Sequence, residues 1–213
     1  MTVGFPLVAL VVIVAVILVV RLDRAKRSVI LKRAGFIVMA IPAAMFGLFA
    51  LGETSTDPGG WEAVALTLSW ALPLAALAAI AWLRPNWAPW VFAILVAGLI
   101  GVAIWFAADT EGWRAFEDRN GPVRDIGAFT VAFAIALLGL KRPRPAGILL
   151  LVLGIVPLSI FVASHEGFRG IELLWVLTYP PVVTGVLYLL SAYAESGSPG
   201  RAPIEPHGQP SPG

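Results

Sequence analysis

The sequence predicts an all-α fold, a polytopic membrane helix bundle with seven transmembrane helices. Of its 213 residues, 59% are apolar before its 21 glycines are added, whereas an ordinary soluble domain contains about 45–50% with glycine included. Only 13% of the residues are charged. These charges fall in clumps, and the apolar runs between them are long enough to cross a hydrocarbon core about 30 Å thick. The composition therefore excludes a soluble globular protein.

Windows of about 20 apolar residues locate the individual spans. The first span has neither a basic segment before it nor a small-x-small cleavage site after it, which indicates an uncleaved anchor rather than a signal peptide. The fifth is the weakest, because its 15 residues rise only about 22 Å and need their flanks or a locally thinner bilayer. In chain order, the spans are expected at residues 3–20, 34–52, 63–83, 87–108, 126–140, 146–164 and 173–193.

Basic residues predict the orientation of these spans, because short cytoplasmic loops carry most of the Lys and Arg of a membrane protein. With the N-terminus outside and the C-terminus inside, eleven basic residues fall on the cytoplasmic side and four fall outside. The alternation holds through every loop only if all seven spans are present. We therefore expect a plasma-membrane protein. Its bias toward Arg, Ala, Gly and Pro suggests a GC-rich bacterial genome, in which case this is the inner membrane.

The first cytoplasmic loop holds six of the basic residues. Each contributes about 1 kcal/mol to binding an anionic bilayer surface, so lipid binding is one interpretation of the cluster. The simpler interpretation, which we favour, is that the cluster only sets the topology. The six residues are Arg21, Arg24, Lys26, Arg27, Lys32 and Arg33.

Two stretches of the predicted outer loops are alike and indicate an internal repeat. Residues 111–117 read EGWRAFE, and residues 166–172 read EGFRGIE. The cytoplasmic turns before them also match, with LRP at 83–85 and KRP at 141–143. Each unit is expected to be a two-helix hairpin, turned where a proline stops the preceding helix, and the two units are expected to be parallel rather than inverted copies. The two units extend over about residues 61–117 and 122–172.

Small residues recur at every fourth position on three of the spans. This spacing lets helix backbones approach closely in lipid. We interpret it as ordinary bundle packing, and a dimerisation face is the alternative. The stripes are Ala71, Ala75 and Ala79; Ala93, Ala97 and Gly101; and Ala128, Ala132 and Ala136.

The position of the ionisable residues limits the chemistry. None of the Asp, Glu, Lys and Arg residues and neither His lies deep inside a predicted span, whereas proton relays, ion pumps and Schiff-base sites need such a residue at depth. The chain has no cysteine, which excludes disulfides and thiolate metal sites. We expect no catalytic residue, no cofactor and no bound metal, and the dispersed basic residues argue against a nucleic-acid partner.

The repeated outer motif is the remaining polar constellation. Its charges are spaced at three, so a helical segment would place them on one face as i,i+3 ion pairs. One interpretation is an external site for a metal or a polar ligand, including an enzyme at the outer face. We favour a solvated interfacial turn, in which each exposed pair contributes under about 1 kcal/mol. The residues are Glu111, Arg114, Glu117, His165, Glu166, Arg169 and Glu172.

The seventh span carries two adjacent prolines at its middle. They remove two backbone donors and disfavour helix at the residue before them, so a kink or a short break is expected. Broken helices line substrate sites in transporters, although a kink for packing is the interpretation that we favour. The candidate pathway residues are Thr178, Tyr179, Pro180, Pro181, Thr184 and Tyr188.

These observations favour a non-catalytic integral component of the membrane. The spans occupy residues 1–195, and residues 196–213, rich in Pro, Gly and Ser, are expected to form a disordered cytoplasmic tail. The expected partners are the lipid bilayer and either another membrane protein or a second copy of the chain. The alternative function is a channel or facilitator for a small neutral or apolar solute, with its pathway at the seventh span.

Overall fold

The computed structural model describes residues 23–56, 60–109, 111–112, 123–164 and 171–196. The predicted first span and residues 197–213 of the predicted tail lie outside these residues, whereas Ser196 ends the last helix. The described part of the chain is all-helical, which confirms the predicted fold class. The helices are α2 (Arg24–Thr56), α3 (Gly60–Leu83), α4 (Ala88–Ala108), α6 (Val123–Gly139), α7 (Pro143–Ser164) and α8 (Ile171–Ser196).

Several of these helices suit a membrane. Four segments are long and apolar enough to cross one, on α2, α3, α4 and α7. The apolar part of α6, Gly127–Gly139, is shorter, in agreement with the weak fifth span of the sequence analysis. The four segments are Lys26–Phe49, Gly60–Leu83, Ala88–Trp105 and Pro143–Ile160.

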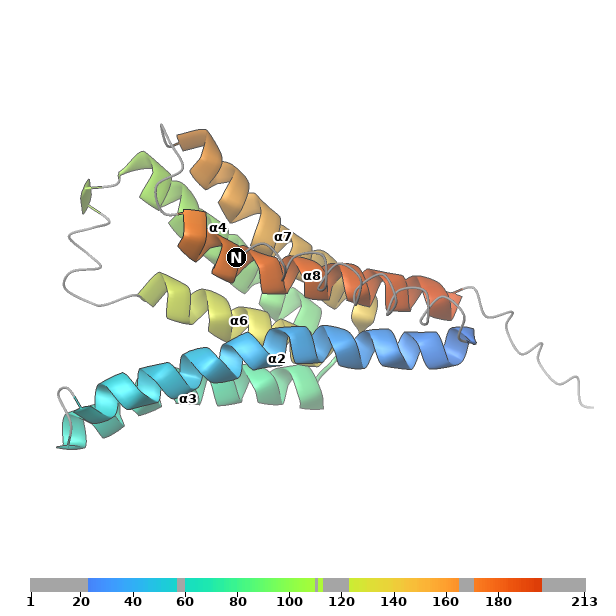
Figure 1. Ribbon diagram of the computed structural model, residues 1–213, viewed down its shortest axis with the longest axis horizontal. Coiled ribbons are helices and arrows are strands. Elements are labelled where there is room, and N and C mark those ends of the chain that lie inside the picture. The colour runs from blue at the N-terminus through green and yellow to red at the C-terminus, as the bar shows by residue number, and fades with distance from the viewer. Residues whose placement is uncertain (1–22, 57–59, 110, 113–122, 165–170, 197–213) are drawn as a thin grey trace, which may run out of the picture.

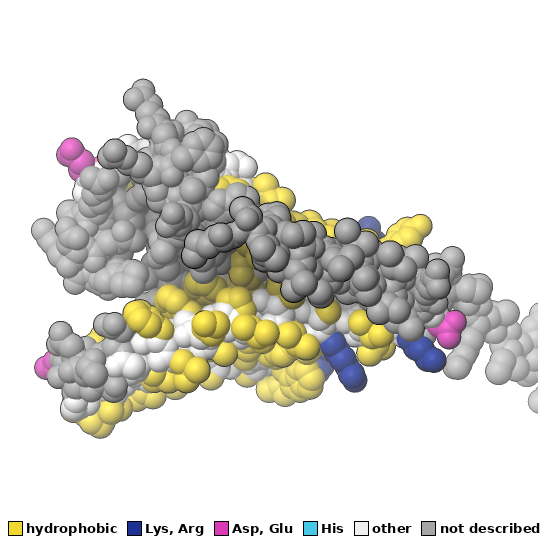
Figure 2. Space-filling view, viewed as in Figure 1, with side chains coloured by type: hydrophobic (Ala, Val, Ile, Leu, Met, Phe, Trp, Pro, Cys, Tyr) yellow, Lys and Arg dark blue, Asp and Glu magenta, His cyan; other side chains and the backbone are white. Residues whose placement is uncertain are grey.

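The helices run alternately between two ends of the molecule, and α2 begins where α8 finishes (Figure 1). We call this the basic end and the opposite one the far end. Every Lys and Arg side chain that the structure describes belongs to the start of α2, to the turns after α3 and α6, or to the start of α7. Figure 2 shows the visible Lys and Arg side chains toward the basic end. These residues are Lys26, Arg27, Lys32, Arg33, Arg84, Lys141, Arg142 and Arg144.

The start of α2 corrects the predicted first loop. The helix begins at Arg24, and the Arg27 backbone N donates to the Asp23 carbonyl at 2.8 Å. No Gly or Pro lies in residues 24–34, and Ala, Lys, Arg and Leu are good helix formers. Most of the basic cluster is therefore the first part of a 33-residue helix rather than a loop.

The predicted break in the last span does not occur, because α8 continues through Pro180 and Pro181. Both prolines are buried. On the adjoining helix α7, a Cβ built on Gly154 would lie 2.7 Å from Val182 Cγ2 and 3.3 Å from the Thr178 carbonyl oxygen. Close packing of α7 thus supports a helical backbone that the local sequence disfavours.

The tightest packing joins α8 to its two neighbours, α7 and α2. A Cβ built on Gly147 of α7 would lie 2.9 Å from the Gly185 carbonyl oxygen of α8, and one built on Gly185 would lie 2.9 Å from the Gly147 carbonyl oxygen. The two backbones can approach this closely only because both positions lack a side chain. The buried cluster around this contact includes Met39, Ile135, Leu150 and Tyr188.

By contrast, α3 and α4 hardly touch each other, although they are joined by a tight turn in which the Trp87 and Ala88 backbone N atoms donate to the Arg84 carbonyl at 3.0 Å. Figure 1 shows α3 diverging from α4 toward the far end. Instead α3 packs on α6, and α4 packs mainly on α7. The predicted turn between α3 and α4 is therefore present, but the two helices do not pack closely on each other. Each packs instead on a helix of the other predicted unit. Whether the two units are repeats stays a prediction.

Candidate functional site

The candidate pathway residues of α8 divide by their exposure. Tyr179 is exposed and Thr178 is half-buried, whereas the other four, Pro180, Pro181, Thr184 and Tyr188, are buried. The Thr184 hydroxyl donates to the Gly35 carbonyl of α2 at 3.1 Å, and the Tyr188 hydroxyl donates to the Ala136 carbonyl of α6 at 2.6 Å. These two hydroxyls join α8 to its neighbours.

The Tyr188 hydrogen bond also completes the C-terminal end of α6. The last four carbonyls of an α-helix have no donor within the helix, and the carbonyl of Ala136 is one of these. The Leu140 backbone N donates to the Leu137 carbonyl instead, at 3.3 Å. The phenol ring reaches Ala136 because glycines flank it, Gly35 on α2 and Gly139 on α6. Tyr188 was predicted as a candidate pathway residue, whereas its hydroxyl completes a helix end.

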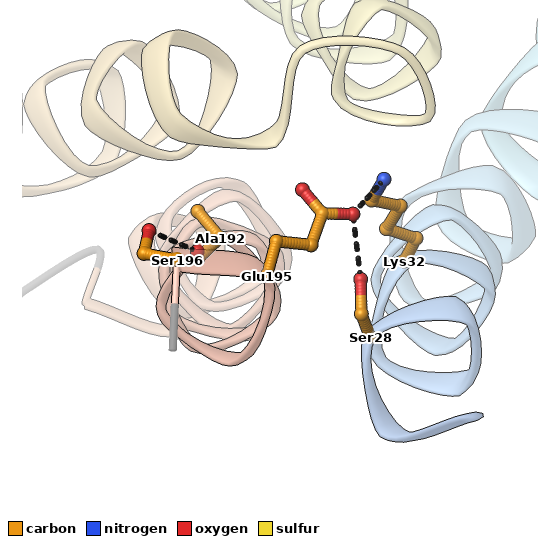
Figure 3. Close-up of polar contacts among 5 residues, drawn as sticks. All are labelled: Ser28, Lys32, Ala192, Glu195 and Ser196. Carbon is orange, nitrogen blue, oxygen red and sulfur yellow. Dashed lines mark hydrogen bonds and ion pairs between the residues drawn. The ribbon is translucent and has the colours of Figure 1, made fainter. Parts of the chain in front are cut away.

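At the basic end, one ion pair joins the start of α2 to the end of α8 (Figure 3). Glu195 Oε1 accepts from Ser28 Oγ at 2.7 Å and lies 2.5 Å from Lys32 Nζ. Partial burial raises the pKa of Glu195, but the hydrogen bonds from Lys32 and Ser28 and the charge of Lys32 outweigh it, so the pKa lies below its ordinary value of 4.5. Lys32 is thus engaged within the protein.

This contact separates the candidate lipid-binding residues. Lys26 and Arg33 are exposed, Arg27 is half-buried, and Lys32 holds Glu195. Arg21 and the side chain of Arg24 lie outside the described residues. Among the four of these side chains that the structure describes, Lys26 and Arg33 are therefore the exposed ones.

The two turns at the basic end also contact each other. Lys141 Nζ donates to the Trp82 carbonyl at 2.6 Å and lies 4.1 Å from the centroid of the Trp82 ring. The Arg142 guanidinium donates to the Asn86 side-chain oxygen. The basic residues of the second turn therefore hold the first turn in place.

The outer-face constellation falls almost wholly outside the described residues. Glu111 is exposed, and the side chain of Glu172 is not among those described although its backbone belongs to α8. Within the described part of the chain, no group of three or more His, Asp or Glu side chains could hold a metal ion. The candidates outside the description are Arg114, Glu117, His165, Glu166 and Arg169.

A groove between α2 and α3, with α6 as its floor, was not predicted. Its volume is about 550 Å³, and α2 lines it from Phe36 to Leu51. Phe36 and Phe46 pack on Phe133 and Phe129 of α6, with ring centroids 5.9 and 4.9 Å apart. Trp70 and Leu74 of α3 form the opposite wall. Trp70 lies near the middle of the predicted span 63–83, and this position in the sequence was a signal for the groove.

The fold defines a class of protein: an all-helical chain with several helices able to cross a membrane, joined through buried hydroxyls and close glycine contacts. Comparisons with models of protein families, with curated proteins and with solved structures find no match. Function is therefore argued from the geometry of this chain alone.

Proposed function

We propose that the protein is a non-catalytic, multi-pass component of the plasma membrane that packs against another membrane protein. The observation that carries this proposal is that the same spacing of small residues lies inside the bundle on α6 and on exposed surface on α3 and α4. Ala132 and Ala136 of α6 are buried inside the bundle, whereas Ala75 of α3 and Ala97 and Gly101 of α4 are exposed. Small residues at such spacing bring helices into close contact in lipid, so the exposed stripes suit helices of a partner.

The exposure of α3 and α4 supports the same proposal. Ala81 is the one buried residue among those of α3, and large apolar side chains such as Leu72, Trp90 and Ile94 are exposed. The buried hydroxyls of Thr184 and Tyr188, in contrast, are bonded to backbone carbonyls. This use of the buried polar groups favours a role in assembly over one in catalysis.

The partner face is tested by enlarging its small residues. A Cβ built on Gly101 meets nothing within 4 Å, so Gly101→Leu leaves the fold of the chain intact while it separates a packed partner helix. After extraction of native membranes in a mild detergent, the wild-type chain should run in a complex heavier than its own 22.6 kDa. Gly101→Leu should run as the chain alone, and Ile94→Leu, which keeps a large side chain, should run as wild type. A wild-type chain without a partner, or a complex that survives in Gly101→Leu, contradicts the proposal.

The proposed topology has seven spans, an outer N-terminus and a cytoplasmic C-terminus. Because the chain has no cysteine, single cysteines report on each side. Arg84 and Glu111 are both exposed, at the basic end and the far end respectively. A maleimide that cannot cross membranes should label Thr2→Cys and Glu111→Cys in intact cells, and should label Arg84→Cys only after lysis. Labelling of Arg84→Cys in intact cells contradicts the orientation, and protection of Thr2→Cys contradicts the predicted first span, residues 3–20.

A further inference from the structure

The groove between α2 and α3 is long and narrow. Along α2 it extends from Phe36 to Leu51, which is about 22 Å at a rise of about 1.5 Å per residue. A volume of about 550 Å³ spread over this length describes a furrow that suits one slender chain laid along α2.

The lining of the groove suits a hydrocarbon. Beyond the indole of Trp70 and the hydroxyl of Thr130, the side chains that line it are aliphatic or aromatic, or belong to Gly and Ala. Ala44, Leu48 and Leu51 are exposed lining residues, so the groove is open along one side. It lies on two helices that can cross a membrane. Together, these features fit a lipid acyl chain that enters sideways from the bilayer.

The charges around the groove indicate where the lipid headgroup lies. Arg33 precedes Ala40, Ala44 and Leu51 by 7, 11 and 18 residues, a spacing that places all four on one face of α2. Lys26 is a further two turns before Arg33 on this face, and both basic side chains are exposed. Figure 2 shows Lys and Arg side chains beside the hydrophobic surface of α2 and α3 at the basic end.

The far end of the groove has the opposite charge. No Lys or Arg lies in residues 34–83, whereas the described part of the chain has an exposed carboxylate, Glu62, in the first turn of α3. An anionic headgroup is repelled there and attracted at the basic end. We propose that the groove binds one acyl chain of an anionic phospholipid, with the phosphate of the headgroup held by Arg33 and supported by Lys26.

Lipid retention measured by native mass spectrometry tests this site. The full-length protein is exchanged into an equimolar mixture of phosphatidylglycerol and phosphatidylethanolamine and then released from detergent. Wild type should retain one phosphatidylglycerol per chain, in at least fivefold excess over phosphatidylethanolamine. Arg33→Gln should lose this preference. The neighbouring Lys32→Gln, which makes the same change of charge, should keep it, because Lys32 is directed to Glu195.

A second pair of variants tests the groove itself. Gly47 lies on the groove wall, where Leu fills the space in front of Trp70, and Gly98 lies on open surface of α4. Gly47→Leu should lose the bound lipid, and Gly98→Leu should retain it. Equal retention of the two lipids by wild type, equal loss of preference in Arg33→Gln and Lys32→Gln, or a lipid that persists in Gly47→Leu overturns the proposal. The Arg33→Gln and Lys32→Gln variants, which enlarge no side chain, keep the test decisive if Gly47→Leu does not fold.

Discussion

Two pairs of neighbouring helices show how this bundle is held together. α7 and α8 pack so closely that Gly147 and Gly185 face each other backbone to backbone, whereas α3 and α4, joined by a tight turn, hardly touch. Apolarity does not explain the difference, because α3 and α4 are at least as apolar as α7. In lipid, an apolar side chain gains no hydrophobic free energy when it moves from contact with acyl chains to contact with another helix. Close backbone packing and hydrogen bonds therefore decide which helices associate.

The largest expected effect comes from breaking the closest contact. Gly185→Leu forces α7 and α8 apart, because even a Cβ at this position would lie 2.9 Å from a backbone oxygen. We expect the free energy of unfolding to fall by about 1–3 kcal/mol or more, as in overpacked cores. Unfolding by SDS in mixed micelles, followed by helical circular dichroism, measures this loss. Gly98→Leu on the open surface of α4 should change stability by less than about 0.5 kcal/mol. Equal losses in the two variants would remove the contrast between the helix pairs.

A smaller effect should follow when the hydroxyl at the end of α6 is removed. Tyr188→Phe leaves the phenyl ring in place but deprives the buried Ala136 carbonyl of its donor. Leaving a buried acceptor unsatisfied costs about 1–3 kcal/mol. The same unfolding measurement should show this loss for Tyr188→Phe and none for Tyr179→Phe, since Tyr179 is exposed. A Tyr188→Phe variant as stable as wild type would show that the ring alone joins α6 to α8.

The smallest effect concerns the ion pair between α2 and α8. Because the pKa of Glu195 is lower in the folded protein than its ordinary value of 4.5, the pair contributes fully above pH 4.5, and this contribution is lost as pH falls through the folded pKa. The Glu195 side chain is 44% exposed, so the contribution is under about 1 kcal/mol. Wild type should lose this stability below pH 4.5, and Glu195→Gln should lack it at every pH. Glu62→Gln, at the far end, should follow wild type, and an identical pH dependence in Glu195→Gln contradicts the assignment.

The elements of the fold were largely predictable because they depend on local sequence. Apolar windows found all six described helices, and the short α6 was recognised from its length. The extension of α2 to Arg24 was missed because charged residues were interpreted as a loop, although they are good helix formers. The continuity of α8 through Pro180 and Pro181 was missed because it depends on α7, which is distant in sequence.

The candidate sites were harder to predict because they depend on which faces meet. Lys32 is paired with Glu195 near the end of α8, whereas Arg33 is exposed. A count of the basic residues in each loop cannot distinguish the two. Likewise, the groove is formed where α2 and α3 meet α6, whereas the matching turns of the sequence predicted contacts of α3 with α4. Each of the three stripes begins with a half-buried residue, but only the structure shows that the stripe of α6 continues into the core, whereas those of α3 and α4 continue onto exposed surface.

The end of α6 gives the assembly of this protein an order in time. The Ala136 carbonyl of α6 accepts its hydrogen bond from the Tyr188 hydroxyl of α8. The ribosome makes α6 before it makes α8. Before α8 is made, the Ala136 carbonyl lacks the Tyr188 hydroxyl, and the surfaces of α2 and α7 that pack on α8 lack this partner. A chain that stops before residue 171 therefore lacks the donor to the Ala136 carbonyl. α8 thus completes the packing of α2, α6 and α7, which are made before it.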